Sequence, residues 1–431
     1  MPGGRFQGRR VALVDGCRTP FLRSGTGYID LMAYELGAMA VAGLLKKTRV
    51  PPAAVDRLLF GTVLQEPRTS NVAREVGLAV GLPNGCPAYT ITAACISSAV
   101  AIASAAEAIS GGQADVVIAG GVETLSDVPI RFKRPVRKRL IAAQKARGAG
   151  DYFALLKGLT PSDLLPDAPA IAEFSTGLTM GDNGELLAKR FGITRQEQDL
   201  WAMTSHHRAA RATAEGLYQD QILPAYVPPD FTPIASDNGV RADTSIEKLA
   251  RLPPVFDKRF GTVTAGNSSF LTDGAAACLL MSEEKAKELG CEPLAFVTSA
   301  ALVAIDPVEE LLLGPVFATP AALDAAGLAL SDVGVFEIHE AFAAPVLAVV
   351  KLLADETYCR ERLGRAPLGT IDTAKLNAWG GSLSVGHPFG ATGARLVTTC
   401  ARRMVHEGAR HGLVTACAAG ALGHAIVLSR P

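Results

Sequence analysis

The sequence predicts an α/β fold in which strands and helices alternate along the chain. Short, mainly apolar runs such as Val55–Gly61 and Ala114–Ala119 are separated by longer stretches with helical spacing of apolar residues, such as Leu31–Leu45. Apolar residues make up 48% of the 431 residues and aromatic residues only 6%, which suits closely packed layers better than a β-sandwich. Runs that are apolar almost throughout predict strands buried on both faces of a parallel or mixed sheet.

The elements of the first half follow from local patterns. Pro20 ends the first strand, because proline cannot donate to a strand ladder. An Ala-rich run after Cys95 predicts a helix that stops at Gly111-Gly112, since Ala is the best helix former and Gly commonly ends helices. The other expected elements are a strand at Arg10–Asp15, a helix at Leu31–Leu45, a strand at Val55–Gly61, a helix at Asn71–Val80 and a strand at Ala114–Ala119.

The second half appears as a repeat of the first. Gly111–Gly121 and Glu407–Gly420 each read as a helix end, a polar turn, a buried strand and a bend of small residues. Further upstream, Pro293–Ile305 matches the first strand and Val333–Ile338 matches Val55–Gly61, in the same order. Three matches in one order predict a duplicated βαβ-rich unit. We therefore divide the chain into halves at residues 1–292 and 293–431.

The segment from about 128 to 251 differs from its surroundings and is interpreted as an inserted loop domain. Thr194, with Glu197 in the capping-box position, predicts the start of the second helix of a pair within Phe191–Gly216. Eight basic residues and no acidic residue fall within residues 131–147, and Val136, Leu140 and Ala143 form a narrow apolar stripe. A basic amphipathic hairpin and a simply solvated charged face are both consistent with this pattern.

Charge and cysteine usage exclude several classes of protein. The formal net charge is zero, so no global field favours nucleic acid. The eight cysteines contain no CxxC pair, which argues against a zinc site or a disulfide scaffold and for a reducing compartment. The few residues before the first strand lack a signal-peptide core. We expect a cytoplasmic protein.

Cys95 is the first candidate for chemistry. It lies between a β-branched stretch and the Ala-rich helix, and a helix N-terminus is expected to lower the pKa of a thiol from about 8.5. The alternative is a small apolar residue of the core.

Three further clusters lie where strands are expected to end. His339-Glu340 begins an incomplete HExxH pattern, but residue 343 is Ala, so no metal is assigned. His387 lies in a loop with five glycines between Trp379 and Gly393, whose spacing is not that of a dinucleotide loop. Cys417 ends a buried strand and precedes small residues. Taken alone, a histidine in such a loop and a cysteine at such a strand end are more often structural than catalytic.

Together these clusters resemble the thiolase family along nearly the whole chain. The resemblance rests on Cys95, His339-Glu340-Ala341-Phe342, Gly386-His387-Pro388 and Cys417, with Arg18-Thr19-Pro20 and Asn267-Ser268-Ser269 in support. Within the family, the trifunctional-enzyme β-subunit type is most similar. The resemblance implies a layered αβαβα thiolase fold with duplicated halves.

The resemblance also implies a reaction: cleavage of a 3-ketoacyl-CoA by coenzyme A in fatty-acid β-oxidation, with no permanently bound cofactor. Cys95 would be the nucleophile, His387 the base and Cys417 the acid. His387 with His339, and the backbone N–H groups of Cys95 and Ala419, would form two oxyanion holes. Ser269 would contact CoA. His339 and Ala419 depart from the Asn and Gly of many thiolases.

Three alternatives and several partners follow from the same resemblance. The alternatives are an acetyl-CoA C-acetyltransferase working in the condensing direction, a ketoacyl-synthase-like enzyme and a non-catalytic thiolase-like subunit. A ketoacyl synthase would be expected to carry a second histidine where Cys417 stands. Expected partners are CoA and acyl-CoA substrates, further copies in a homodimer or homotetramer, and an α-subunit with hydratase and dehydrogenase activities. Basic residues 131–147 are interpreted as a contact with that subunit or with an anionic membrane surface, and CoA phosphates are a third target for one or two of these charges.

Overall fold

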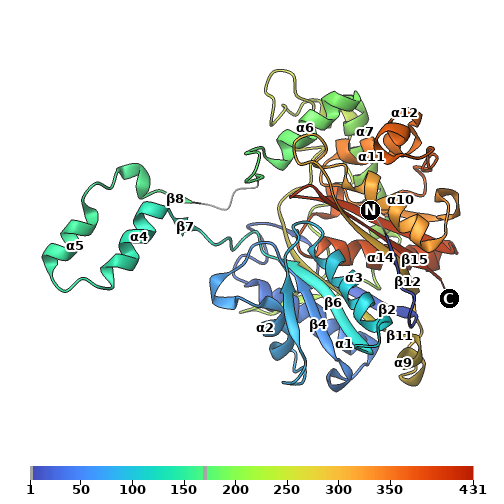
Figure 1. Ribbon diagram of the computed structural model, residues 1–431, viewed down its shortest axis with the longest axis horizontal. Helices are drawn as coiled ribbons and strands as arrows, with labels where there is room; N and C mark the ends of the chain where they lie inside the picture. The colour runs from blue at the N-terminus through green and yellow to red at the C-terminus, as the bar shows by residue number, and fades with distance from the viewer. Residues whose placement is uncertain (1–2, 168–171, 431) are drawn as a thin grey trace.

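The computed structural model describes residues 3–167 and 172–430, and its main strands form one hydrogen-bonded series in the order β13-β14-β15-β12-β2-β11-β6-β4-β5 (Figure 1). The strands of the first half are β1 (Gly4–Arg5), β2 (Val11–Arg18), β3 (Leu22–Arg23), β4 (Arg57–Gly61), β5 (Ala88–Ile91), β6 (Val116–Glu123) and β11 (Thr272–Ser282). Those of the second half are β12 (Ala295–Ala304), β13 (Val335–Ile338), β14 (His411–Ala418) and β15 (Leu422–Ser429).

The strand order confirms the duplication. In the first half β4 is parallel to β6, and β6, β11 and β2 then pair antiparallel. In the second half β13 is parallel to β14, and β14, β15 and β12 pair antiparallel in the same sequence. The two halves meet where β2 pairs with β12 over Val11–Leu13 and Ala295–Val297. The three matches seen in the sequence are β2 with β12, β4 with β13 and β6 with β14.

Helices divide the molecule into five layers. The central layer is α3 (Ser97–Ser110) and α14 (Thr392–Glu407), which contact each other and strands of both halves. The outer layer of the first half is α1 (Ala33–Thr48) and α2 (Val72–Ala79), and that of the second half is α10 (Gly314–Ala326) and α11 (Ala343–Ala354). One apolar cluster fills the space between the sheets, and two more lie beneath the outer helices. This is the αβαβα order that the resemblance implied.

Close approach in the central layer depends on glycine. A Cβ at Gly393 would lie 2.6 Å from the backbone nitrogen of Ala99, and one at Gly390 would lie 2.4 Å from the carbonyl oxygen of Val122. Contacts this short cannot be met by side-chain movement alone, so both positions need a residue without a Cβ. The start of α14 therefore packs directly on α3 and β6.

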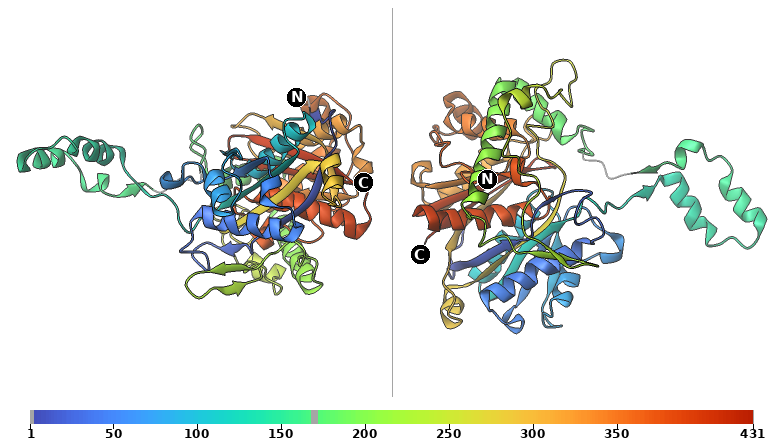
Figure 2. Two further views of the ribbon diagram at one scale, coloured as in Figure 1. Left: turned by 90° about the horizontal axis from the view of Figure 1, so that it is seen from below. Right: turned by 180° about the vertical axis from the view of Figure 1, so that it is seen from behind.

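The predicted insertion contains two different kinds of structure. One part is a hairpin of α4 (Arg134–Ala143) and α5 (Ala149–Leu156), which extends away from the body and has β7 (Arg131–Phe132) and β8 (Pro166–Asp167) at its base (Figures 1 and 2). The other part, α6 (Met180–Phe191) and α7 (Arg195–Ala214), packs on α11 of the second half. Shorter elements include β9 (Ala225–Val227), β10 (Thr232–Ile234), α8 (Ile246–Ala250), α9 (Glu283–Glu288), α12 (Glu356–Tyr358) and α13 (Ser382–Val385).

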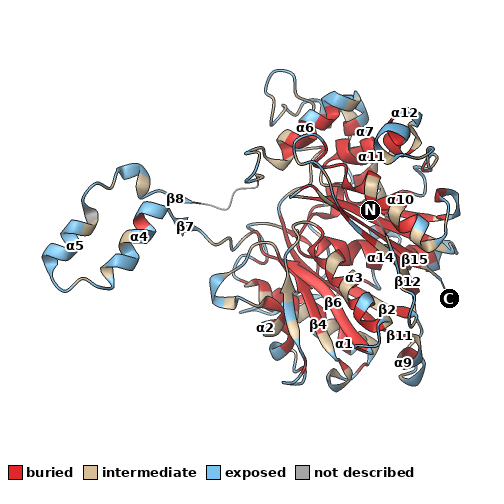
Figure 3. Ribbon diagram, viewed as in Figure 1, coloured by how far each residue is buried: buried red, intermediate tan, exposed pale blue. Residues whose placement is uncertain are grey.

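The hairpin exposes many of its side chains (Figure 3). Val136 of the predicted apolar stripe is buried, but Leu140 is 52% exposed. The segment does form a helical hairpin, but its apolar stripe is only partly covered, so the amphipathic hairpin and the solvated charged face both remain open. Other large apolar side chains that are exposed on or beside the hairpin are Ile130, Phe132, Ile141, Tyr152, Phe153, Leu164 and Leu165.

Some predicted boundaries were wrong. The first strand ends at Arg18 and not at Asp15. The helix pair was predicted to begin at Phe191, but it begins at Met180, and Phe191 is the last residue of its first helix. The Thr194 cap is confirmed: its hydroxyl accepts from the N–H of Glu197 at 3.2 Å, and the carboxylate of Glu197 accepts from the N–H of Thr194 at 2.7 Å. Among the described residues, no helix is long and apolar enough to span a bilayer.

Candidate active site

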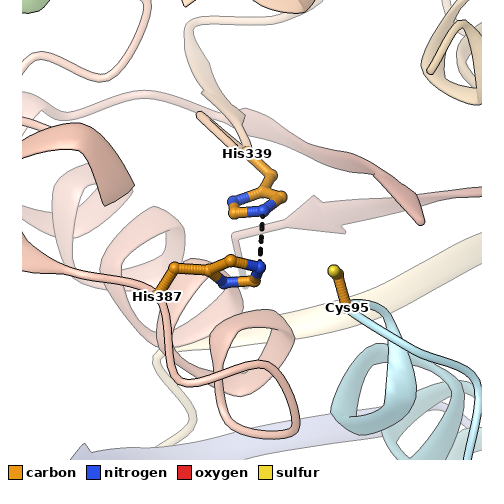
Figure 4. Close-up of side chains that lie close together, drawn as sticks. All are labelled: Cys95, His339 and His387. Carbon is orange, nitrogen blue, oxygen red and sulfur yellow. Dashed lines mark hydrogen bonds between the residues drawn. The ribbon is translucent and has the colours of Figure 1, made fainter. Parts of the chain in front are cut away.

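Cys95, His339 and His387 come together although they are far apart in the sequence. The Cys95 sulfur and one ring nitrogen from each histidine all lie within 4.8 Å of one another, and the three side chains point toward a common centre (Figure 4). His339 directly follows β13, and His387 lies between α13 (Ser382–Val385) and α14. Two of the three clusters predicted from sequence thus meet at Cys95.

Cys95 lies in the turn that joins β5 to α3. The helix begins at Ser97, two residues later than the sequence indicated, and Ala94 adopts a left-handed conformation with φ of 47°. A non-glycine residue with positive φ is uncommon and stores strain. The turn directs the thiol toward the two histidines.

The expected lowering of the Cys95 pKa was wrong. Burial raises the pKa of this thiol to about 12, and the neighbouring Cys417 adds to the rise. The backbone N–H groups of Ala419 and of Cys95 itself act in the opposite direction. Desolvation by the surrounding layers outweighs the stabilising groups at the turn, so the resting side chain is a neutral thiol.

Both histidines are neutral as well. Burial, followed by the positive charge of Arg395, lowers the pKa of His387 to about 3. Burial and the neighbouring His387 hold the pKa of His339 well below its usual value. At neutral pH each ring therefore has one N–H donor and one nitrogen lone pair.

The hydrogen bonds assign the tautomer of His387. The hydroxyl of Thr392 donates its proton to the carbonyl oxygen of Pro388 at 2.8 Å. The Thr392 hydroxyl oxygen therefore accepts from Nδ1–H of His387 at 2.7 Å. The lone pair of His387 is consequently on Nε2, which faces Cys95 and His339.

A second chain of hydrogen bonds assigns His339. Arg395 donates to the Ser382 hydroxyl oxygen at 2.6 Å, which leaves the Ser382 proton for Nδ1 of His339 at 3.0 Å. His339 then carries its proton on Nε2 and donates to Nε2 of His387 at 3.2 Å. This tautomer gives His339 the donor that many thiolases obtain from Asn at this position.

Glu340 holds the histidine loop against the predicted insertion. Its buried carboxylate accepts from Trp201 at 3.1 Å and Ser205 at 2.7 Å on α7, and from Asn377 at 2.8 Å. The Ser205 hydroxyl also accepts from the N–H of Gly381. Helix α7 therefore supports the loop that leads to His387.

Cys417 neighbours Cys95, and the segment that contains Ser269 contacts both histidine loops. Cys417 is buried near the end of β14, and burial raises the pKa of its thiol to about 12. The N–H of Gly420 donates to Glu173, which lies in the insertion between β8 and α6. The N–H of Ser269 donates to the carbonyl oxygen of Ala341 at 2.9 Å, and Leu271 forms a backbone bridge with His387. The segment that contains Ser269 thus lies between the two histidine loops.

The sequence analysis missed Thr392, Ser382 and Arg395. Ser382 lies in the glycine-rich loop, and Thr392 and Arg395 lie in the first turn of α14. Thr392 is five residues after His387, and Arg395 is eight residues after it. Their position beside a candidate base was an available signal. Their partners depend on the packing of α14, which the sequence pattern does not show.

Comparison with known proteins gives a consistent result. Family models described as "Thiolase, N-terminal domain" and "Thiolase, C-terminal domain" match residues 11–284 and 291–430. The chain is 48% identical over 421 residues to the mitochondrial trifunctional enzyme subunit beta of Bos taurus, covering 97% of this chain and 88% of that protein. It is also 48% identical over 423 residues to a 3-ketoacyl-CoA thiolase of Pectobacterium atrosepticum, covering 98% of this chain and 97% of that protein.

Solved structures agree with these relatives. The acetyl-CoA acetyltransferase of Bacillus anthracis superposes with a TM-score of 0.84 at 32% identity, covering 98% of each chain. Human mitochondrial 3-ketoacyl-CoA thiolase in complex with CoA gives a TM-score of 0.81 at 32% identity, also covering 98% of each chain. In sequence and in fold, the chain belongs to the thiolase family.

Proposed function

We propose that this protein is a 3-ketoacyl-CoA thiolase of fatty-acid β-oxidation, an acyltransferase that uses CoA as co-substrate and holds no permanent cofactor. The observation that carries the proposal is the convergence of Cys95, His339 and His387, with Cys417 beside them. The names of the most similar relatives support this substrate class.

The first step transfers the thiol proton of Cys95 to Nε2 of His387 while the sulfur attacks the 3-keto carbon. Because both groups rest in their neutral forms, proton transfer accompanies formation of the carbon–sulfur bond and does not precede it. The bond between C2 and C3 then breaks, and its electron pair forms the enolate of acetyl-CoA. The acyl group remains as a thioester on Cys95.

Cys417 supplies the proton that completes this half-reaction. Its raised pKa keeps a proton on the sulfur at neutral pH, and donation to C2 of the enolate releases acetyl-CoA. Cys417 then takes the proton of the incoming CoA thiol, whose sulfur attacks the acyl thioester. The products are the shortened acyl-CoA and Cys95, whose sulfur leaves the thioester and regains its proton from His387.

Two sets of N–H donors stabilise the negative charge that develops on oxygen. Nε2–H of His339 and the newly protonated Nε2 of His387 form one oxyanion hole, directly or through a water. The backbone N–H groups of Cys95 and Ala419 form the other, and their effect on the Cys95 pKa supports their position near the sulfur. Ser269 is assigned to CoA because its segment borders both histidine loops.

Mass spectrometry of quenched turnover tests the nucleophile. An acyl adduct is expected on the peptide that contains Cys95, and an adduct found only on another cysteine would refute the assignment. Cys417→Ala should block thiolysis of a ketoacyl-CoA but still permit acylation of Cys95 by a saturated acyl-CoA. If this variant thiolyses at the wild-type rate, the acid–base role of Cys417 is wrong.

A chain-length series separates the main alternative. The likeness to an acetyl-CoA acetyltransferase structure keeps a short-chain, condensing enzyme as the second candidate. Rates of thiolysis would be measured on 3-ketoacyl-CoAs from four carbons upward. Activity confined to acetoacetyl-CoA would favour the acetyltransferase, whereas activity on longer chains supports the β-oxidation enzyme.

We assign the hairpin α4–α5 as the contact with an α-subunit that carries hydratase and dehydrogenase activities, within an assembly of two or four copies of this chain. The name of the mitochondrial relatives and the exposed basic and apolar side chains of the hairpin support this assignment. Docking on an anionic membrane is the alternative.

The division of the chain and its location are proposed on separate grounds. The matched ranges 11–284 and 291–430 support halves at residues 1–292 and 293–431, with residues of about 128–251 as an insertion into the first. All eight cysteines are free, which supports a reducing, cytoplasmic location. Protease digestion between residues 284 and 291, and fractionation of cells, test these two assignments.

A further inference from the structure

The convergence of one thiol and two imidazoles has a consequence outside acyl transfer. We propose that Cys95, His339 and His387 form an inhibitory binding site for a borderline-soft divalent cation, Zn²⁺. The donor set is one sulfur and two nitrogens within 4.8 Å of one another. Zn²⁺ is bound by cysteine sulfur and histidine nitrogen, and three protein ligands with an open fourth position are typical of reactive zinc sites. The sequence did not predict this site, because its only metal-binding pattern, the HExxH start at His339-Glu340, lacks the second histidine. The three donor residues come from segments that are far apart in the chain.

The geometry is close to that of a tetrahedral site. Zinc bonds of about 2.0–2.1 Å to nitrogen and about 2.3 Å to sulfur place adjacent ligand atoms roughly 3.3–3.6 Å apart. The two Nε2 atoms of His339 and His387 are already 3.2 Å apart. The Cys95 sulfur lies within 4.8 Å of both nitrogens, and rotation about its one side-chain bond, Cα–Cβ, changes its distance to them.

The surrounding hydrogen bonds suit metal ligation. Metal-binding histidines bond through one nitrogen and are held through the other, here by Thr392 for His387 and by Ser382 for His339. The ligand form is neutral imidazole, which both rings already adopt. His339 must move its proton from Nε2 to Nδ1, and the Ser382 oxygen can accept that new N–H bond because it is a hydroxyl.

The charge balance follows from the same groups. Binding replaces the Cys95 proton by the cation, so Zn²⁺ and a neutral thiol give a zinc–thiolate bond and one proton released to solvent. Arg395 opposes a cation here, and the carboxylate of Glu337 lies 3.9 Å from its guanidinium and counters it. Two neutral ligands and one thiolate leave the site with a net charge of one, which water or an anion at the fourth position can offset.

Inhibition follows from the identity of the ligands. The lone pair of His387 and the sulfur of Cys95 are the groups assigned to the first step of thiolysis, so the bound cation removes both. This consequence depends on the proposed function, but binding does not. The test therefore measures binding without turnover.

Cobalt(II) substitution is the direct experiment. The full chain, without an affinity tag, is titrated anaerobically with CoCl₂, and Zn²⁺ is then added as a competitor. One equivalent of Co²⁺ should give a sulfur-to-cobalt charge-transfer band with intense visible bands of tetrahedral cobalt, and Zn²⁺ should remove both. Absence of these bands overturns the proposal, even if the enzyme thiolyses ketoacyl-CoA.

Variants locate the bound ion. Cys95→Ser should abolish the charge-transfer band, and His339→Asn should weaken Co²⁺ binding by at least the roughly 10–100-fold that loss of an outer-shell partner costs. Cys417→Ala, which removes the neighbouring thiol outside the three-residue cluster, is the matched control and should bind Co²⁺ as the wild type does. Bands that persist in Cys95→Ser, or that disappear in Cys417→Ala, place the ion elsewhere and refute the site.

Discussion

At the scale of single residues, the proposed chemistry depends on which ring nitrogen of each histidine carries a proton. Two neutral imidazoles face each other through Nε2, and the hydroxyl groups of Thr392 and Ser382 assign opposite tautomers to them. His387 is thereby poised to accept a proton and His339 to donate a hydrogen bond. A base and an oxyanion donor result from two otherwise identical side chains, because their neighbours differ.

Thr392→Val tests this assignment. Valine has the same shape but cannot accept from Nδ1–H of His387, so the tautomer with the lone pair on Nε2 loses its support. We expect kcat to fall roughly tenfold or more, equivalent to at least about 1.4 kcal/mol of transition-state stabilisation, while the KM for CoA changes little.

Thr398→Val is the matched control for that experiment. It removes a buried hydroxyl from the same helix, but that hydroxyl donates to the carbonyl oxygen of Ala394 and has no contact with His387. A similar loss of kcat in both variants would show that α14 is merely sensitive to substitution, and the tautomer argument would fail.

At the scale of elements, the loop before α14 positions His387 through its backbone. Gly386 has φ of 104°, which residues with a Cβ rarely adopt. A Cβ here would also lie 2.7 Å from the hydroxyl oxygen of Thr272, the same atom that accepts the N–H of His387 at 3.0 Å. One residue therefore determines both the shape of the loop and the anchor of the candidate base.

Gly386→Ala should displace His387 without changing any side chain of the site. We expect backbone strain to lower the free energy of unfolding by about 1–3 kcal/mol. We also expect kcat to fall at a temperature where the variant is still fully folded, so that unfolding does not account for the lost activity. Denaturant unfolding and steady-state kinetics on one preparation measure both. Unchanged kcat in a destabilised variant would show that the loop tolerates the shift. Gly364→Ala, another positive-φ position with open space around its Cβ, controls for strain alone.

The hairpin α4–α5 yields a prediction about association. Arg134, Arg137 and Lys138 are exposed on α4, whereas Arg139 donates to the carbonyl oxygen of Lys157 and supports the hairpin itself. Replacing the first three by Glu should weaken co-purification of an α-subunit, more strongly at low salt than at high salt, because exposed charges are screened. Thiolysis of a short ketoacyl-CoA should keep its kcat, since the hairpin projects away from the body of the molecule.

Two comparisons make the hairpin experiment decisive. The control variant replaces three exposed basic residues outside the hairpin by Glu: Arg5, Lys46 and Lys258. It changes the net charge by the same amount and should leave co-purification of the α-subunit unchanged. Loss of binding to anionic liposomes without loss of co-purification would favour a membrane contact. A rise only in the KM for CoA would assign the segment to the substrate site instead.

Local sequence signals predicted elements well where a residue acts through its own neighbours. Thr194 and Glu197 cap α7 as expected, because a capping box involves only four residues. Ala94 gave no signal for the left-handed turn that delays α3, since Ala usually favours helix. The direction of the Cys95 pKa could not be predicted, because burial depends on layers contributed by both halves of the chain. His339, His387 and Cys417 were found through a family pattern, whereas Thr392 and Ser382 required tertiary contacts.

At the scale of the whole molecule, duplication places the site between the two halves. Helices α3 and α14 occupy equivalent positions in the repeat and pack together in the central layer. Cys95 precedes the first of them and His387 precedes the second. The repeat thus brings the proposed nucleophile of one half to the proposed base of the other, deep enough that every group involved is desolvated.

Desolvation of histidines also has a consequence for the stability of the whole protein. His424 on β15 is 3% exposed, and neither ring nitrogen has a hydrogen-bond partner within the part of the chain that the structure describes. Burial lowers the pKa of His424 to about 3. A buried ring without hydrogen bonds lowers the free energy of unfolding at any pH. A ring that stays neutral in the folded state lowers it further in acid, because the unfolded chain can take up a proton there.

The sign of the acid effect follows from linkage. Between about pH 6.5 and pH 3 the unfolded chain binds a proton at His424 that the folded chain does not, so the free energy of unfolding decreases as the pH falls through this window. At pH 5 the difference amounts to about 2 kcal/mol, because each pH unit below 6.5 contributes about 1.4 kcal/mol. Burial raises the pKa of Glu123 to about 7, so the folded chain binds a proton there more readily than the unfolded chain does. Glu123 therefore increases the free energy of unfolding as the pH falls, and the wild-type response to acid is the sum of this gain and the loss from His424.

A single substitution isolates the histidine contribution. His424→Leu removes the titrating ring and leaves Glu123 in place, so the difference between variant and wild type contains only the effect of position 424. We expect the variant to be as stable as the wild type or more stable at pH 7.5, and to gain a further 2 kcal/mol or so relative to it at pH 5. Denaturant unfolding at both values measures the difference. A difference that stays constant with pH would show that His424 takes up its proton in the folded state, through a partner or a water that satisfies the ring.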